Sequence, residues 1–374
     1  MSKHGRYEKR KPPKKGKKAV LILLSVLALL LIGVAVAGVM IYNSMLNKID
    51  HVEVVEQDYT MTDELLAMMG TEPSAETTEA TEETTVPTTV VTEPTEPKEP
   101  DILNVLVTGQ SFREGETSRL ADTLILVTVN KDTKVVTLTS FLRDTYVDLP
   151  DYMGHSCGWN RINTNYALGY VWGGTGGAME MTNLCIKNNF GIEVDYNVEV
   201  GFEAFEKVID VLGGVRIELT QEEADYINKM DKDWLQEVTP GENRLFGETA
   251  LEYARMRKAE GDSDSDIKRT ARQRTLLTAL FNKIKTKGVS AIQDLANEVL
   301  PMVSTNMNNA QITECLFDVL PLLVDMTIET GTCPVQGTYW AEDKETPDGW
   351  ASVLVFASNE QKNLMMPITE GRKP

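Results

Sequence analysis

The chain is 374 residues long and has 37 Lys or Arg against 56 Asp or Glu, which gives a net charge of −19. This acidity argues against nucleic acid as a partner, because a nucleic-acid site needs a basic surface. Only His4, His51 and His155 are present, which leaves almost no material for a histidine-dependent catalytic triad or a histidine-rich metal site.

The N-terminal region has the pattern of a membrane anchor. Residues 1–18 contain nine Lys or Arg and one Glu, and residues 19–42 form an uncharged apolar run long enough to cross a bilayer. The basic flank predicts a cytoplasmic tail at 1–18, a single transmembrane helix at 19–42 of the cell membrane, and an extracellular remainder. A cleaved signal peptide is the alternative, although its apolar core is usually shorter.

Two segments separate this run from the globular part. Residues 43–70 form a juxtamembrane segment of mixed apolar and acidic residues, and residues 71–100 are almost wholly Thr, Glu and Pro. The second composition cannot bury a core, so it predicts an extended stalk that holds the next domain away from the bilayer. Residues 101–374 then form one domain of roughly 270 residues.

Strand and helix patterns mix throughout this domain. Apolar runs at 101–109, 123–129 and 134–140 predict strands, the last two as a hairpin. Later segments predict helices at 176–190, 202–212, 247–254, 266–287, 290–303 and 309–324, and strands at 194–200, 215–219, 326–331 and 351–356. The expected fold is α/β, a mixed β-sheet sandwiched by helices on both faces.

One short region concentrates positive charge within this acidic chain. It contains Arg255, Arg257, Arg269, Arg272 and Arg274, with Gln273 among them. Guanidinium groups match phosphate oxygens and stay charged at any working pH, so a phosphate-bearing ligand is the first hypothesis. Arg269, Arg272 and Gln273 fit on one helical turn, and Asp266 is expected to cap that helix. The alternative is solvated surface charge paired with nearby acids.

Three further motifs are weaker by themselves. Asp122 stands at the entrance of the second strand, where a carboxylate can hold magnesium together with substrate phosphates or simply begin a strand. Residues 143–145, Arg-Asp-Thr, follow the third strand, and loops at strand ends commonly build sites in α/β sheets. The glycine-rich residues 173–177 lack the lysine and spacing of a nucleotide-binding loop, and we interpret them as a flexible turn.

The four cysteines are Cys157, Cys185, Cys315 and Cys333. In this topology all four lie outside the cell, where disulfides persist. Four cysteines allow three pairings, and adjacency in sequence favours Cys157 with Cys185 and Cys315 with Cys333. None has the pattern of a catalytic nucleophile.

The order of several motifs resembles the LytR-CpsA-Psr family from about residue 101 to the C-terminus. The matching segments are 105–109, 121–123, 140–145, 161–163, 202–205, 212–215, 245–250, 253–257 and 269–273. The resemblance implies a membrane-anchored phosphotransferase that moves an anionic glycopolymer, such as teichoic acid or capsular polysaccharide, from a polyprenyl pyrophosphate carrier to peptidoglycan. It also implies an apolar groove for the lipid, and magnesium at the pyrophosphate.

The resemblance assigns roles to particular residues. Asp122 matches a magnesium carboxylate and Arg143 matches the arginine of the strand-end motif, and these two are the expected catalytic groups. The expected pyrophosphate-binding residues are Arg119, Arg143, Arg161, Arg255, Arg257, Arg269, Arg272 and Gln273. Arg272 is supported only by its place in the helical turn of Gln273.

The largest departure from the family pattern is Ser111. It stands where the family commonly has the first metal-binding aspartate. Three alternatives follow: Asp122 binds magnesium with substrate phosphates, Glu114 or Glu116 substitutes for the missing aspartate, or the arginines carry more of the charge. This departure keeps two other functions open. One is a non-catalytic protein that binds lipid-linked polymers or regulates their assembly, and the other is a pyrophosphohydrolase that releases phosphorylated polymer.

Overall fold

A computed structural model describes residues 46–53, 100–110, 120–230, 232–256, 265–286, 298–319, 322 and 325–371. Its centre is a seven-stranded sheet with the order β1-β10-β7-β2-β3-β4-β11. The strands are β1 (Asp50–His51), β2 (Ile102–Gln110), β3 (Ala121–Asn130), β4 (Val135–Phe141), β7 (Tyr196–Gly201), β10 (Val303–Thr305) and β11 (Thr327–Cys333). The pairs β2–β3, β3–β4 and β10–β7 are antiparallel, whereas β2–β7, β4–β11 and β1–β10 are parallel, which confirms the mixed sheet.

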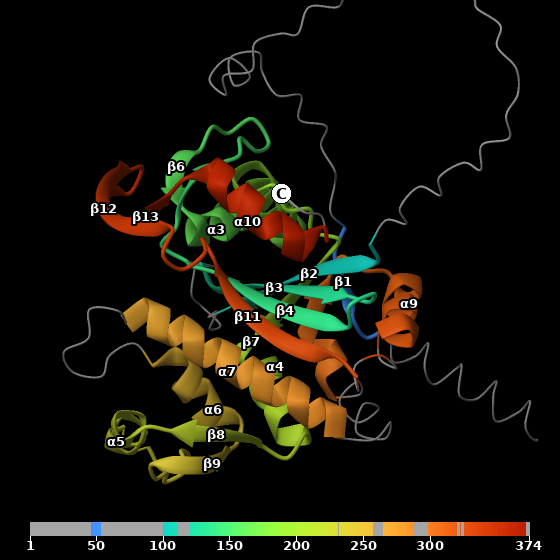
Figure 1. The fold of residues 1–374 in the computed structure, drawn as a ribbon, viewed down its shortest axis with the longest axis vertical. Helices are drawn as coiled ribbons and strands as arrows, with labels where there is room; N and C mark the ends of the chain where they lie inside the picture. The colour runs from blue at the N-terminus through green and yellow to red at the C-terminus, as the bar shows by residue number, and fades with distance from the viewer. Residues whose placement is uncertain are drawn as a thin grey trace, which may run out of the picture.

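Helices cover both faces of this sheet, as expected (Figure 1). One face carries α3 (Ile162–Phe190) and α10 (Ser358–Thr369), and the other carries α4 (Phe202–Val211), α6 (Gly247–Arg255) and α7 (Ser265–Thr286). The side-chain alternation of β3 explains the two layers, because Leu124 and Leu126 pack toward α3 while Ile125 and Val129 pack toward α7. The sheet is therefore buried on both faces.

Smaller elements surround the central layers. Beyond α6 lie α5 (Gln221–Lys229) and the hairpin of β8 (Val215–Leu219) and β9 (Gly241–Leu245), which share a core with α4 and α7. Two more hairpins are β5 (Tyr146–Leu149) with β6 (Gly158–Arg161), and β12 (Tyr339–Thr346) with β13 (Gly349–Phe356). The helix α9 (Asn309–Val319) follows β10, which is preceded by the short turn η1 (Leu300–Met302).

The glycine-rich residues 173–177 lie inside α3. Gly173 and Gly174 have non-helical backbone angles, and Gly174 has φ 63°, so the chain turns there between two helical halves. The halves pack closely, since a Cβ on Gly169 would lie 2.5 Å from the carbonyl oxygen of Gly177. This confirms the interpretation as a turn, but the structure shows a tightly packed one.

Two predictions about the N-terminal third concern the transmembrane span and the stalk. No helix among the described ranges is long and apolar enough to cross a membrane, and the predicted span 19–42 lies outside those ranges. Most of the predicted stalk at 71–100 also lies outside them. However, β1 pairs with β10 of the sheet before that segment begins, and β2 enters the same sheet after it. Described residues on both sides of the predicted stalk thus belong to one sheet, and the stalk itself stays a prediction.

The predicted disulfides are not formed, because none of the four cysteines is bridged to another. Cys315 lies near Tyr196 at the start of β7, and Cys333 ends β11, four strand positions across the sheet. Four strand spacings are roughly 19 Å, far beyond the Cα separation that a disulfide allows. Cys185 and Cys333 are buried in the core, and burial raises the pKa of both thiols, so neither is an activated nucleophile.

Candidate active site

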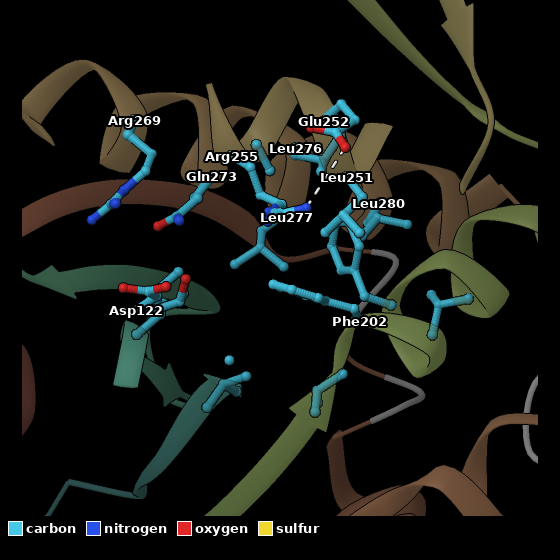
Figure 2. A pocket seen from close by; sticks show the side chains of 18 of the residues that line it. Asp122, Phe202, Leu251, Glu252, Arg255, Arg269, Gln273, Leu276, Leu277 and Leu280 are labelled. Carbon is cyan, nitrogen blue, oxygen red and sulfur yellow. Dashed lines mark ion pairs between the residues drawn. The ribbon is translucent and has the colours of Figure 1, made fainter. Parts of the chain in front are cut away.

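A cavity of about 620 Å³ lies between the sheet and the helices α4, α6 and α7 (Figure 2). Most of its wall is apolar and comes from one face of the sheet and the inward sides of the three helices. The apolar lining residues are Val107, Ile125, Val200, Phe202, Phe205, Val208, Leu251, Ala254, Leu276, Leu277 and Leu280. Such a wall has the chemistry to hold a long hydrocarbon group.

Polar groups gather at one part of this cavity. Asp122 reaches it from β3, while Arg269 and Gln273 reach it from α7 and Arg255 from the end of α6 (Figure 2). Arg269 and Gln273 are four residues apart, so they lie on the same side of the helix. We call these four residues the polar rim. The fold brings them together although Asp122 and Gln273 are 151 positions apart in sequence.

Arg255 is held in place by its neighbours. Its guanidinium carbon lies 4.8 Å from the centre of the Phe202 ring, and Nη1 lies 3.6 Å from Oε1 of Glu252. Glu252 also contacts Nζ of Lys232 at 3.2 Å, so its single negative charge is shared between two cations. Arg255 keeps positive charge available to an anion in the cavity, in a geometry fixed by stacking and pairing.

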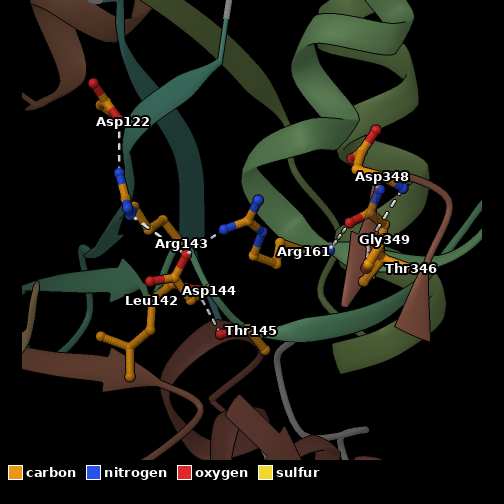
Figure 3. A network of polar contacts seen from close by, with 10 residues as sticks. Asp122, Leu142, Arg143, Asp144, Thr145, Arg161, Thr346, Asp348 and Gly349 are labelled. Atoms are coloured by element: carbon orange, nitrogen blue, oxygen red, sulfur yellow. Dashed lines mark hydrogen bonds and ion pairs between the residues drawn. The ribbon is translucent and has the colours of Figure 1, made fainter. Parts of the chain in front are cut away.

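A line of charged groups continues away from the cavity (Figure 3). Nη1 of Arg143 lies 3.2 Å from Oδ1 of Asp122, and Nε lies 3.5 Å from Oδ1 of Asp144. Nη1 of Arg161 contacts the same oxygen of Asp144 at 3.6 Å. We call Asp122, Arg143, Asp144 and Arg161 the polar ladder.

Backbone hydrogen bonds fix the ladder to two separate elements. The amide of Ile162 donates to the carbonyl of Thr145, the amide of Asn163 donates to that of Arg143, and the amide of Leu354 in β13 donates to that of Asp144. The ladder's charged side chains are therefore positioned by backbone contacts from α3 and β13. Nε of Arg161 is buried and makes no hydrogen bond in the described structure, which leaves donor capacity for a ligand.

Arg272 does not join the rim. Its Nε lies 2.7 Å from Oε1 of Glu223 and its Nη1 donates to the carbonyl of Met256 at 3.0 Å. Arg272 is buried and is not among the residues that line the cavity. It joins α7 to α5 and to the chain after α6, which is a structural role rather than the predicted ligand contact.

Some predicted site residues cannot be placed. Arg119, Arg257 and Ser111 lie outside the described residues, as do Glu114 and Glu116. Among the residues that the structure describes, no three His, Cys, Asp or Glu side chains gather as a metal site. Asp122 is thus a single carboxylate that already contacts Arg143.

Of the groups that support the predicted residues, the sequence reasoning missed Phe202. Phe202 and Glu252 fix Arg255, and Asp144 bridges two arginines. Glu252 lies three residues before Arg255 on the same helix, a spacing that predicts contact. The stacking on Phe202 has no local signal, because the two residues come together only through the packing of α4 on α6.

The fold and cavity define an α/β protein whose arginine-bearing rim lies against an apolar chamber. The LytR_cpsA_psr family matches residues 65–351. Polyisoprenyl-teichoic acid–peptidoglycan teichoic acid transferase TagT of Bacillus subtilis is 32% identical over 267 residues, which cover 70% of this chain and 74% of TagT. The chain therefore belongs to the LytR_cpsA_psr family.

Other relatives agree with this assignment. The corresponding transferase TagU of Oceanobacillus iheyensis is 31% identical over 207 residues, covering 55% of this chain and 58% of TagU, so the match spans less than two thirds of that relative. The crystal structure of B. subtilis TagT superposes with a TM-score of 0.53 at 25% identity, covering 75% of this chain and 96% of TagT. TagT bound to LI-WTA gives a TM-score of 0.54 at 25% identity, with coverage of 75% and 95%.

Proposed function

We propose that this protein transfers an anionic glycopolymer, of the teichoic acid or capsular polysaccharide type, from a polyprenyl pyrophosphate carrier to peptidoglycan. The observation that carries the proposal is the junction of the apolar cavity with the polar rim and ladder. A polyprenyl pyrophosphate has the same two parts, a long apolar tail and a compact anion. Its tail fits the cavity wall, and its phosphates meet Arg143, Arg255 and Arg269.

The relatives support the same chemistry. TagT and TagU are named as transferases that act between a polyisoprenyl-linked teichoic acid and peptidoglycan, and one TagT structure is described as bound to LI-WTA. These names support transfer of a lipid-linked polymer by this chain. They do not select between teichoic acid and another anionic polymer.

The proposed reaction is a displacement at the phosphorus that bears the glycan. The acceptor hydroxyl oxygen forms a bond to that phosphorus, the bond to the lipid phosphate breaks, and the lipid monophosphate leaves. The proton of the hydroxyl passes to Asp122 or Asp144, the two carboxylates of the ladder. The arginines stabilise charge that spreads over the departing phosphate, so positioning and electrostatics supply most of the rate.

The proposal includes magnesium, to which the protein would contribute few ligands. Magnesium commonly takes one or two carboxylates and completes its shell with water and phosphate oxygens. Among the described residues Asp122 is the carboxylate that fits this pattern at the rim, so it would hold a cation that the substrate pyrophosphate also binds. A bound cation would neutralise part of the pyrophosphate charge.

The membrane location belongs to the same proposal. An uncleaved helix at 19–42 would place the domain outside the cell, next to both the lipid carrier and the wall. Leu46 follows that run by four positions and is already packed in the domain. The cavity would therefore be held close to the bilayer that contains its substrate.

The test is a transfer assay with the full chain in detergent, a lipid-pyrophosphate-linked glycan, peptidoglycan and magnesium. We expect Arg143→Ala to lower the transfer rate by about 100-fold, because it removes a donor to the charge that develops on the phosphates. Arg216→Ala is the matched control, because Arg216 pairs with Glu242 on the exposed β8–β9 hairpin. Equal rates for wild type and Arg143→Ala would reject the site.

The same assay separates the rival functions. A binding or regulatory protein would retain the lipid-linked glycan but neither transfer it nor cleave its pyrophosphate at saturating magnesium. A pyrophosphohydrolase would release phosphorylated polymer even with acceptor present. Transfer with formation of a polymer–peptidoglycan phosphodiester contradicts both.

A further inference from the structure

The hairpin of β5 and β6 carries an aromatic pair beside the polar ladder. The rings of Tyr146 and Trp159 have centroids 5.2 Å apart and planes tilted by 36°. Trp159 is 51% exposed, although tryptophan is a large apolar side chain that proteins usually bury in large part. We call these two residues the aromatic platform.

The pairing register connects the platform to the ladder. Tyr146 lies directly opposite Arg161, and Asp148 lies directly opposite Trp159. Residues that face each other across an antiparallel pair share one face of the hairpin, as do residues two apart on one strand. Tyr146, Trp159 and Arg161 therefore share a face, and Arg161 contacts Asp144 of the ladder.

A second hairpin supports the platform from the side. The hydroxyl of Tyr146 donates to the carbonyl of Glu345 at 3.3 Å, and the side-chain amide of Asn160 donates to Asp348 at 3.1 Å. Trp350 lies directly opposite Glu345 in the β12–β13 pairing and is 75% exposed. Exposed aromatic groups thus continue past the platform onto the next hairpin.

The direction of the proposed reaction decides what this surface would bind. In a displacement at phosphorus the attacking and leaving oxygens are roughly in line. The leaving lipid phosphate belongs with the tail in the cavity, so the attacking hydroxyl approaches from the side away from the cavity. The ladder runs in that direction, from Asp122 at the cavity to Arg161 beside Tyr146.

We propose that the aromatic platform binds the glycan strand of the peptidoglycan acceptor and brings its hydroxyl to the ladder. Sugar rings present C–H groups on one face, which pack on aromatic rings, and hydroxyls at their edges, which hydrogen-bond to charged groups. An open surface also suits a long polymer, whereas the enclosed cavity suits a lipid tail. This assignment rests on the proposed transfer function and adds the acceptor site to it.

The test compares Trp159→Ala with Trp159→Phe in the full chain. Trp234→Ala is the control for loss of an exposed indole, because Trp234 is 62% exposed and its ring centre lies 5.5 Å from Nζ of Lys232, in the segment between α5 and β9. Binding is measured by calorimetry with a β-1,4-linked N-acetylglucosamine oligomer and by co-sedimentation with purified peptidoglycan. Binding of the lipid-pyrophosphate donor is measured in parallel, and thermal unfolding checks that every variant is folded.

We expect Trp159→Ala to weaken glycan binding and to raise the acceptor KM about tenfold, which corresponds to about 1.4 kcal/mol. Trp159→Phe should restore part of this loss, while Trp234→Ala and donor binding stay at wild-type values. Unchanged glycan binding in Trp159→Ala would overturn the proposal, as would a loss confined to the donor. Glycan binding is measured without turnover, so a wild type that binds glycan but does not transfer polymer refutes the proposed function and leaves the platform standing.

Discussion

At the residue scale, Arg272 differs from Arg255 and Arg269, because those two line the cavity and Arg272 does not. Its side chain and that of Glu223 are each about nine-tenths buried and meet at 2.7 Å. Removing one partner leaves the other charge buried and unpaired. We predict that Arg272→Met lowers the free energy of unfolding by about 3–5 kcal/mol, measured by thermal or denaturant unfolding.

The control for this prediction is Arg216→Met. The Arg216–Glu242 pair is mostly exposed, and such pairs contribute about 0–1 kcal/mol, so this variant should unfold almost as wild type does. Donor affinity per folded molecule should be unchanged in Arg272→Met. A stable Arg272→Met protein that has lost donor affinity would contradict this prediction and would assign Arg272 to the donor site.

Asp148 gives a prediction about pH. Burial, and then repulsion from Asp151, raise the pKa of this carboxyl group above its ordinary 3.8. The folded state thus binds the proton more tightly than the unfolded chain. The stabilisation that this proton gives the folded state is complete below pH 3.8 and is lost as the pH rises through the folded-state pKa. We predict that Asp148→Asn raises Tm at pH 7 and has no such effect below pH 4. Equal gains at both pH values would contradict this cause.

The helical spacing of α7 could predict only part of the site. Arg269 lies four residues before Gln273 and three before Arg272, and both spacings bring side chains near each other. Arg272 pairs with Glu223, which lies 49 residues before it. This pairing leaves Gln273 as the neighbour of Arg269 that faces the cavity. A contact at that separation leaves no periodic signal, so the sequence could assign Arg269 and Gln273 to the site but could not exclude Arg272.

At the scale of elements, long regular strands were the easiest to predict. The apolar runs 123–129 and 134–140 correspond to β3 and β4, paired as a hairpin as expected. The β5–β6 hairpin was not predicted, because each strand has four residues and a polar loop separates them. It carries Arg161 and the platform, so the least predictable hairpin supports part of the candidate site.

The edge strand β1 was also not predictable, because it has only two residues. It is held by more than pairing. Leu46 and Ile49 pack with Ile312 of α9, His51 contacts the carbonyl of Met307 at 2.5 Å and Oδ1 of Asn309 at 2.8 Å, and the amide of Val52 donates to Thr305. These contacts fasten the segment that follows the predicted anchor.

A buried charge should release this segment. We predict that Ile49→Asp places a carboxylate in the apolar cluster, lowers the free energy of unfolding by about 1–3 kcal/mol, and speeds hydrogen exchange of the amides of β10. Lys48→Ala, at an exposed neighbouring position, should leave exchange unchanged. Protection of β10 that is the same in Ile49→Asp as in wild type would show that β1 does not dock.

At the scale of the whole molecule, the apolar, charged and aromatic parts of the candidate site follow one another in space. The apolar cavity lies between sheet and helices, the polar rim and ladder lie at its mouth, and the aromatic platform lies beyond Arg161. The rim comes from β3, α6 and α7, which also line the cavity, whereas the platform comes from the β5–β6 hairpin. Under the proposed function each part would bind a different part of the substrates. The acidic composition of the chain makes this arginine-lined mouth a local exception that can select an anion.

The docked strand changes how the N-terminal region would act. A stalk was expected between membrane and domain, but β1 joins the sheet before the acidic segment starts. The first described residue, Leu46, follows the predicted anchor by four positions and packs in the domain. The cavity would remain near the bilayer, where its proposed lipid substrate resides.

The central claim is that one site binds a lipid tail in the cavity and a pyrophosphate at its rim. The direct measurement is equilibrium binding of a polyprenyl pyrophosphate and of inorganic pyrophosphate to wild type, Leu277→Trp and Arg255→Ala. We predict that Leu277→Trp, which fills part of the cavity, weakens only the lipid by about tenfold or more, whereas Arg255→Ala weakens both ligands by about tenfold. Lipid affinity that is unchanged in both variants would contradict the account.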